Sequence, residues 1–132
     1  MTNLGYLFPD VEAAYVQLVR AMVRVDASTV VPDPRPAEFV RVARVGGESD
    51  LVTDNPRVTF FVWGSSWAAA HDLAQLVRQR VLATDRLGPA NDPLIVYRVV
   101  ELGGPSRAPD LPDGAPCYQF TIQLKIRGIE AP

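Results

Sequence analysis

The stretch Arg57–Leu82, RVTFFVWGSSWAAAHDLAQLVRQRVL, contains the two elements that decide the fold. Residues 57–63 are mostly apolar at odd and even positions alike, which is typical of a strand covered on both faces. Gly64 ends the strand, and one of the two serines after it can cap the following helix by accepting a hydrogen bond from an unpaired amide. That helix carries an apolar stripe which requires a sheet to pack against: Trp67, Ala70, Leu73, Ala74, Val77 and Val81.

Four further segments supply the remaining elements. Residues 9–24 have the spacing of an amphipathic helix, with Asp10 as its N-cap. The segment 38–45, EFVRVARV, is predicted to pair antiparallel with the central strand, and 94–102, LIVYRVVEL, is strongly β-prone. Residues 117–127, CYQFTIQLKIR, alternate strictly between apolar and polar, which indicates an antiparallel strand with one solvated face.

Proline and glycine mark the connections between these elements. The run PDPRP at 32–36 cannot lie in the middle of a sheet, although a short strand can form just before it at 29–31. Residues 46–50, GGESD, predict a loose hairpin tip, after which 51–54 can resume pairing. Residues 103–116 contain four prolines and three glycines, so we expect a loop without regular structure there, and a frayed tail after the last strand.

The order of elements is therefore helix, short strand, hairpin, helix, strand, long loop and strand. A chain of 132 residues fits one domain with a substantial core. We predict a single α+β domain over residues 1–132, built from one antiparallel or mixed sheet with two helices packed on one face.

Composition excludes several classes of protein. No apolar run approaches the roughly 18 residues of a membrane-spanning helix, and the N-terminus lacks the features of a signal peptide, so neither insertion nor export is expected. The only cysteine is Cys117, so an intrachain disulfide is impossible and a reducing cytosol is the natural compartment. The net charge of −2 argues against a dedicated nucleic-acid-binding protein, although a local basic surface remains open.

The candidates for catalysis are few. His71 lies on the polar face of the long helix, and the nearby GSSW lacks the glycine pattern of a nucleophile elbow, so a solvated or interface histidine is the more common interpretation. Cys117 has no predicted base or helix N-terminus beside it, and a lone cysteine is more often a small buried residue than a nucleophile. We therefore predict no catalytic site.

Acidic residues do not form a recognisable metal or phosphate site. Glu48, Asp50 and Asp54 lack the spacing of a calcium loop, and Asp110 and Asp113 are too few. Neither pair of adjacent glycines belongs to a phosphate-binding motif. We expect solvated loop carboxylates, with no metal and no cofactor.

Arginines are concentrated around the predicted hairpin. Arg41 and Arg44 are three positions apart on an alternating strand, so they face opposite ways. With Arg35 and Arg57 they can form a basic edge. Such charges most commonly lie at a strand edge, where they prevent aggregation with other strands. The sharper hypothesis is contact with DNA phosphates or with carboxylates of a neighbouring subunit.

Four stretches together resemble a known family. They are DVEAAYVQLVRAMV, VPDPRPAEFVRVARVGGESDLVTDNPRVTFFVWGSS, AAAHDLAQLVRQRVL and VYRVVELGGPSRAPDLPDGAPCYQFTIQLKIRG. In order and spacing, over about residues 9–128, they resemble the tail terminator, or tail completion, proteins of long-tailed bacteriophages. Each motif is weak alone; specificity lies in PRP before FVRV, the VTDNPRV segment, and the proline-rich GGP loop before YQFTIQLKIRG.

The resemblance implies a structural protein rather than an enzyme, with no cofactor. Such a subunit forms a homo-oligomer, expected to be a hexameric ring, which caps the head-proximal end of the tail tube, stops its polymerisation and joins the tail to the head–tail connector protein. It assembles in the host cytoplasm and remains in the virion tail. Genome DNA passes through the ring without specific binding, and no membrane is involved.

Other functions remain open. The chain could instead be a head–tail connector or stopper subunit, a tail tube subunit, a nucleic-acid-binding module, or a small cytoplasmic enzyme that uses Cys117 or His71. In the terminator hypothesis, the hairpin 35–57 and the loop 103–116 contact neighbouring subunits or the tail tube. The candidate contact residues are Arg35, Arg41, Arg44, Arg57, Glu48, Asp50, Arg107, Asp110 and Asp113.

Overall fold

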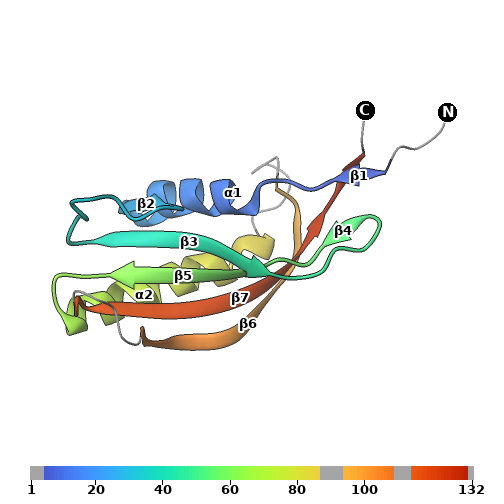
Figure 1. The fold of residues 1–132 in the computed structure, drawn as a ribbon. Helices are drawn as coiled ribbons and strands as arrows, with labels where there is room; N and C mark the ends of the chain where they lie inside the picture. The colour runs from blue at the N-terminus through green and yellow to red at the C-terminus, as the bar shows by residue number, and fades with distance from the viewer. Residues whose placement is uncertain (1–4, 87–93, 109–113, 131–132) are drawn as a thin grey trace.

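The sheet is organised around the central stretch, as predicted. The computed structural model describes residues 5–86, 94–108 and 114–130. In its six-stranded sheet β5 lies between β3 and β7, and α2 follows β5 directly (Figure 1). Along the chain the elements are β1 (Tyr6–Leu7), α1 (Val11–Leu18), η1 (Val19–Val23), β2 (Asp26–Ser28), β3 (Phe39–Gly46), β4 (Thr53–Asp54), β5 (Arg57–Trp63), α2 (Trp67–Leu82), η2 (Thr84–Arg86), β6 (Val96–Arg107), β7 (Cys117–Arg127) and β8 (Ile129–Glu130).

The sheet is mixed, which confirms the predicted class. Strand β2 runs parallel to β3, whereas β3, β4 and β6 make antiparallel pairs with their neighbours β5 or β7. In the centre, Phe60 of β5 lies opposite Val42 of β3 on one side and Phe120 of β7 on the other. Strand β7 pairs with three other strands. Strands β5 and β4 follow one another along one of its edges, and β6 pairs with the other edge.

Both helices cover the same face of this sheet, as predicted (Figure 1). Val58, Phe60 and Val62 point towards the helices and are fully buried. The ring of Phe60 stacks on that of Phe120 at 4.9 Å and meets the ring of Tyr15 from α1 edge-on at 5.9 Å. Burial of side chains of this size stabilises the fold by roughly 1.5–3 kcal/mol each, so this layer holds the domain together.

None of the helices in the described residues covers the other face of the sheet, and its coverage is uneven. Phe39 and Trp63 are buried there in a small cluster with Ala108 and Cys117 at one end of the sheet. Phe61, between that cluster and the sheet centre, stays half-buried. The prediction that both faces of β5 are covered is therefore confirmed on the helix side and only partly confirmed on the other side.

Both predicted helix starts are confirmed. The carboxylate of Asp10 accepts a hydrogen bond from the amide of Ala13 at 3.0 Å, and the hydroxyl of Ser66 accepts one from Ala69 at 3.1 Å. Gly64 lies so close to the backbone of Ala70 that a Cβ at this position would overlap it. The turn between β5 and α2 therefore requires glycine.

Two boundaries differ from the predictions made for them, and the first helix changes type before its end. The short strand before the prolines lies at 26–28 rather than 29–31, because there it can run beside the start of β3. The first helix ends at Arg24, as predicted, where the backbone has a left-handed φ of 63°, but its last five residues, Val19–Val23, form a π-helix. The tail expected to fray instead pairs, with Tyr6 opposite Glu130 in a separate two-stranded ribbon.

The largest correction concerns residues 103–107, which are a strand and not a loop. Strand β6 continues through Gly103 and Pro105 to Arg107. It lies at the edge of the sheet, where a proline need not donate a hydrogen bond to a further strand. Shifts in the pairing register on either side of Gly103 absorb the irregular residues.

Candidate assembly surface

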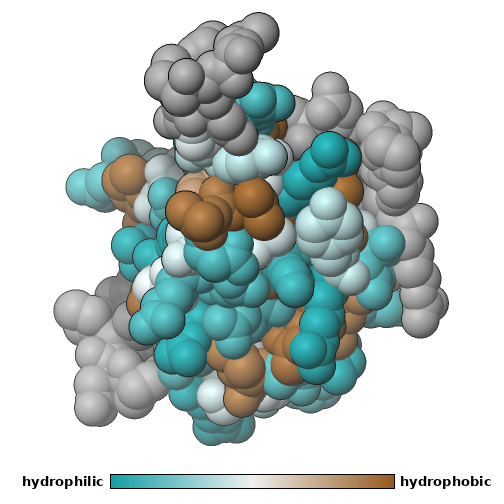
Figure 2. All heavy atoms as spheres, turned by 90° about the vertical axis from the view of Figure 1, so that its right-hand side faces the viewer, coloured by the Kyte–Doolittle hydropathy of each residue, from teal (hydrophilic) through white to brown (hydrophobic). Residues whose placement is uncertain are grey.

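Exposed apolar side chains gather at the end of the molecule where the β1–β8 ribbon and the hairpin between β3 and β5 lie side by side (Figure 2). The side chain of Leu51 at the hairpin tip is 87% exposed. In Figure 2, which views this end, brown apolar side chains lie among teal polar ones. This apolar end comprises Leu7, Val45, Leu51, Val52 and Ile129.

A partly buried ion pair holds the hairpin in place. Nη1 and Nη2 of Arg44 donate to the two carboxylate oxygens of Asp54 at 2.7 and 2.8 Å, and Asp54 is fully buried. The hydroxyl of Ser49 donates to the same carboxylate at 2.8 Å. The backbone amide of Arg44 in turn donates to Glu12 of α1 at 2.9 Å, which ties the hairpin base to the helix layer.

These contacts set the charge of Asp54. Burial alone raises the pKa of this carboxyl, but the hydrogen bonds from Arg44 and Ser49 and the positive charge of Arg44 outweigh burial. Its pKa therefore lies below the ordinary value. The expectation that Asp54 is a solvated loop carboxylate is wrong, because the hairpin brings it under Arg44.

Local hydrogen bonds shape the hairpin tip. Asp50 accepts from the amides of Val52 and Thr53 at 2.9 and 2.7 Å and from the Thr53 hydroxyl at 2.5 Å, and these bonds lower its pKa. The amide and side chain of Asn55 both donate to the carbonyl of Glu48, at 3.1 and 3.0 Å. The tip expected to be loose therefore has a defined shape.

The terminal ribbon packs against this hairpin. The amide of Gly128 donates to the carbonyl of Val52 at 2.8 Å. A Cβ on Gly128 would lie 2.8 Å from that same carbonyl oxygen and 3.0 Å from the ring of Phe8. The glycine between β7 and β8 thus allows a close approach that joins both parts of the apolar end.

The predicted contact residues separate into different places. Glu48 and Asp50 lie at the hairpin tip, and Arg57 lies at the start of β5, exposed on the helix-free face. Arg41 and Arg44 face opposite ways, as predicted, but Arg44 does not join a basic edge because it pairs with Asp54.

The other predicted arginines pack on aromatic rings instead. The guanidinium carbons of Arg35 and Arg41 lie 5.2 and 5.5 Å from the ring centres of Trp63 and Phe61 on the helix-free face. Arg107 covers the ring of Trp67 at 4.6 Å on the helix side. Asp110 and Asp113 fall outside the described residues.

Sequence reasoning missed a second group of basic residues. Lys125 and Arg127 occupy the solvated face of β7, and Arg98 of β6 lies directly opposite Lys125. Together with Arg57 they place four exposed positive charges on the helix-free face. The alternation in β7 already indicated where Lys125 and Arg127 point, but the contribution of Arg98 depends on the pairing register of β6.

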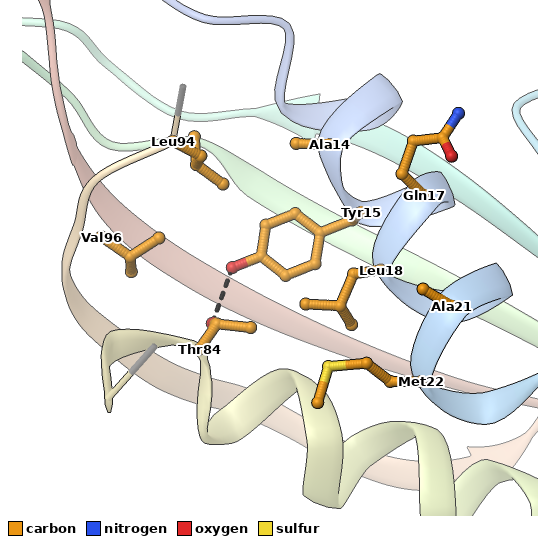
Figure 3. Close-up of a pocket in the computed structure, with 9 residues that line it drawn as sticks. All are labelled: Ala14, Tyr15, Gln17, Leu18, Ala21, Met22, Thr84, Leu94 and Val96. Carbon is orange, nitrogen blue, oxygen red and sulfur yellow. Dashed lines mark hydrogen bonds between the residues drawn. The ribbon is translucent and has the colours of Figure 1, made fainter. Parts of the chain in front are cut away.

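A pocket of about 240 Å³ opens between the first helix, η2 and the start of β6 (Figure 3). Its polar anchor is the hydrogen bond between the hydroxyls of Tyr15 and Thr84 at 2.8 Å. Burial raises the pKa of Tyr15 although the hydrogen bond with Thr84 opposes this, so the phenol is neutral at ordinary pH. The pocket is lined by Ala14, Tyr15, Gln17, Leu18, Ala21, Met22, Thr84, Leu94 and Val96, a lining that offers mainly apolar contacts.

The two candidates for catalysis lie in different environments. Cys117 is fully buried, as expected, and its thiol lies 3.6 Å from the carbonyl of Tyr118. His71 lies at the surface of α2, with Nδ1 3.3 Å from Asp72 and its ring edge-on to Tyr118 at 5.4 Å. Among the described residues there is no group of three histidine, cysteine or acidic side chains able to hold a metal ion.

Comparisons leave the family open. The chain matches no protein-family model and no curated protein sequence. Within the part of the chain that the structure describes, no helix has both the length and the apolar character to cross a membrane.

Proposed function

We propose that this chain is a tail terminator subunit of a long-tailed bacteriophage. It forms a ring, expected to be a hexamer, on the head-proximal end of the tail tube, where it stops polymerisation and joins the tail to the head connector. The subunit assembles in the host cytoplasm and stays in the virion tail. The α+β fold and the order of sequence motifs along the chain both support this function.

The apolar end gives this function its main structural support. Monomeric proteins rarely expose large contiguous apolar patches, and such patches commonly mark protein–protein contacts. Here five exposed apolar side chains gather on a hairpin fixed by the partly buried Arg44–Asp54 pair and on a ribbon bonded to Val52 through Gly128. A surface held this rigidly can dock on a different surface of a neighbouring copy, and contacts of that kind close into rings when the rotation allows.

The two edge strands of the sheet disfavour unlimited polymerisation of subunits by strand pairing, and so favour a closed ring. One edge is the three-residue strand β2, and the other is β6, which carries Pro105 and several shifts in register. Short strands, prolines and bulges at edges hinder the addition of further strands. Docking through the apolar end therefore fits a terminator better than a tube subunit that polymerises without limit.

The test mixes the purified chain with polymerised tail tube protein of the same phage and examines the tubes by electron microscopy. We expect a ring at one end of each tube and no further growth at that end. The matched control replaces Leu51 with Asp, which keeps the fold but places a charge in the apolar end. Rings along the whole tube, or unlimited polymers of this chain alone, would instead identify a tube subunit.

A further inference from the structure

The helix-free face of the sheet carries a concentrated positive charge near the hairpin. Arg57 of β5 lies opposite Gln123 of β7, and Lys125 follows two residues further along β7 on the same face. Diagonal neighbours of this kind are about 7–8 Å apart. Arg98 of β6 lies directly opposite Lys125, and Arg127 continues the row. All four side chains are exposed.

The pairing of Arg98 with Lys125 is unfavourable for folding on its own. Like charges directly opposite one another on neighbouring strands repel and destabilise a sheet. Among the described residues, the carboxylate of Asp50 at the hairpin tip interacts with Lys125. The pKa of Asp50 is lowered chiefly by its hydrogen bonds from Thr53 and Val52 and least by the charge of Lys125. One carboxylate does not balance four cations, so this face keeps an excess of positive charge.

This face is not free of carboxylates, because Asp26 of β2 lies opposite Phe39 and so faces away from the helices, but β2 is at the opposite edge of the sheet from β6. At the strand positions of β3, β5, β6 and β7 that face away from the helices, the structure describes no acidic residue. The neutral side chains near the cations are polar except for Val100, which lies opposite Gln123: the hydroxyls of Thr59 and Thr121 bond to each other at 2.8 Å, and Gln123 donates to the carbonyl of Asn55 at 3.2 Å. The net charge of −2 thus conceals a basic face.

We infer that this basic face, formed by Arg57, Arg98, Lys125 and Arg127, binds the phosphate backbone of double-stranded DNA without reading its sequence. Protein–protein interfaces are depleted of charged residues in their centre, whereas interfaces with nucleic acid are polar and strongly positive. This face has the composition of an interface with nucleic acid. Arginine, lysine, threonine and glutamine side chains are also the groups that contact phosphates. The inference concerns a single subunit and does not depend on ring formation.

The test is fluorescence anisotropy of the full chain with a labelled duplex of about 20 base pairs at several salt concentrations. Contact with about four phosphates gives a slope of about −3.6 for log K against log salt, or about a 150-fold loss of affinity between 50 and 200 mM salt. Replacing Arg98 with glutamate should lower affinity at 50 mM salt about ten-fold or more. Because the introduced carboxylate would face Lys125, the melting temperature should stay the same or rise.

The matched control is Arg80→Glu, which changes the net charge equally but lies on α2, on the other side of the sheet. It should change the affinity less than about two-fold. Equal losses in the two variants, or no salt-dependent binding by the unaltered chain, would overturn the inference. So would a result in which Arg98→Glu alters the mass of the assembly but not DNA binding, because the face would then serve a neighbouring subunit's carboxylates.

Discussion

The layer between the helices and the sheet and the hairpin end of the molecule are ordered by different forces. In the layer, apolar side chains such as Phe60 and Val77 are fully buried and fit against one another. At the hairpin end, the apolar side chains point outward, and the backbone is held instead by the Arg44–Asp54 pair and by glycines that allow close approach. Stability and the composition of the surface can therefore be changed separately in this chain.

The largest effect is expected in the helix-covered layer. Phe60→Ala should lower the free energy of unfolding by about 3–5 kcal/mol, because it removes a buried ring that stacks on Phe120. The matched control is Phe61→Ala on the next residue, which is half-buried on the helix-free face and should cost clearly less. Denaturant unfolding measures both, and equal losses would contradict the difference between the two faces.

A smaller effect is expected at the hairpin base. Asp54→Asn removes the charge that pairs with Arg44, and because Arg44 keeps partial access to water we expect a loss of about 1–3 kcal/mol. Amide hydrogen exchange should speed up between residues 46 and 55 more than in β5. Unchanged exchange at the hairpin would show that other contacts order it.

The same carboxyl predicts a dependence on pH. The folded-state pKa of Asp54 lies below its unfolded value of about 3.9, so the folded protein releases its proton more readily. The resulting stability is fully present above the unfolded pKa and is lost as pH falls through the lower folded pKa. Unfolding free energy should thus stay level from about pH 7 to 5 and decline below about 4.

A control separates Asp54 from Asp50, whose pKa is lowered by the hydrogen bonds from Thr53 and Val52. Asp54→Asn and Asp50→Asn should each flatten part of the acid decline. If neither variant changes the slope below about pH 4, the ionised hairpin carboxylates do not contribute to stability.

The smallest effect on stability is expected at the hairpin tip. Leu51 is 87% exposed, so Leu51→Asp should change the free energy of unfolding by no more than about 0.5 kcal/mol. Thermal unfolding measures this. A drop of several kcal/mol would mean that the tip belongs to the folded core. It would contradict the claim that this surface can be changed without changing stability.

The periodic elements could be predicted from the sequence because their pattern is local. Residues 57–82 and 117–127 show helical or alternating spacing, and their positions are confirmed. The second half of β6 could not be predicted, since Gly103 and Pro105 argue against a strand unless it is known to lie at a sheet edge. The ribbon β1–β8 depends on pairing between the two ends of the chain, which no local pattern indicates.

The candidate surfaces were predictable only in part, because they too depend on contacts between distant segments. Alternation indicated that Arg41 and Arg44 face opposite ways, but the partner of Arg44 lies ten residues away across the hairpin. The basic face combines residues of three strands, so it required the register that sets Arg98 opposite Lys125. Contacts between distant segments are set by register and turn geometry, which a single sequence does not display.

The most direct test of the proposed function is the mass of the purified chain by light scattering after size exclusion, alone and with tail tubes. We predict a closed species near six subunits, either alone or on contact with the tubes, and a monomer for Leu51→Asp under the same conditions. An unaltered chain that stays monomeric in the presence of tubes, or a Leu51→Asp variant that assembles normally, would contradict assembly through the apolar end.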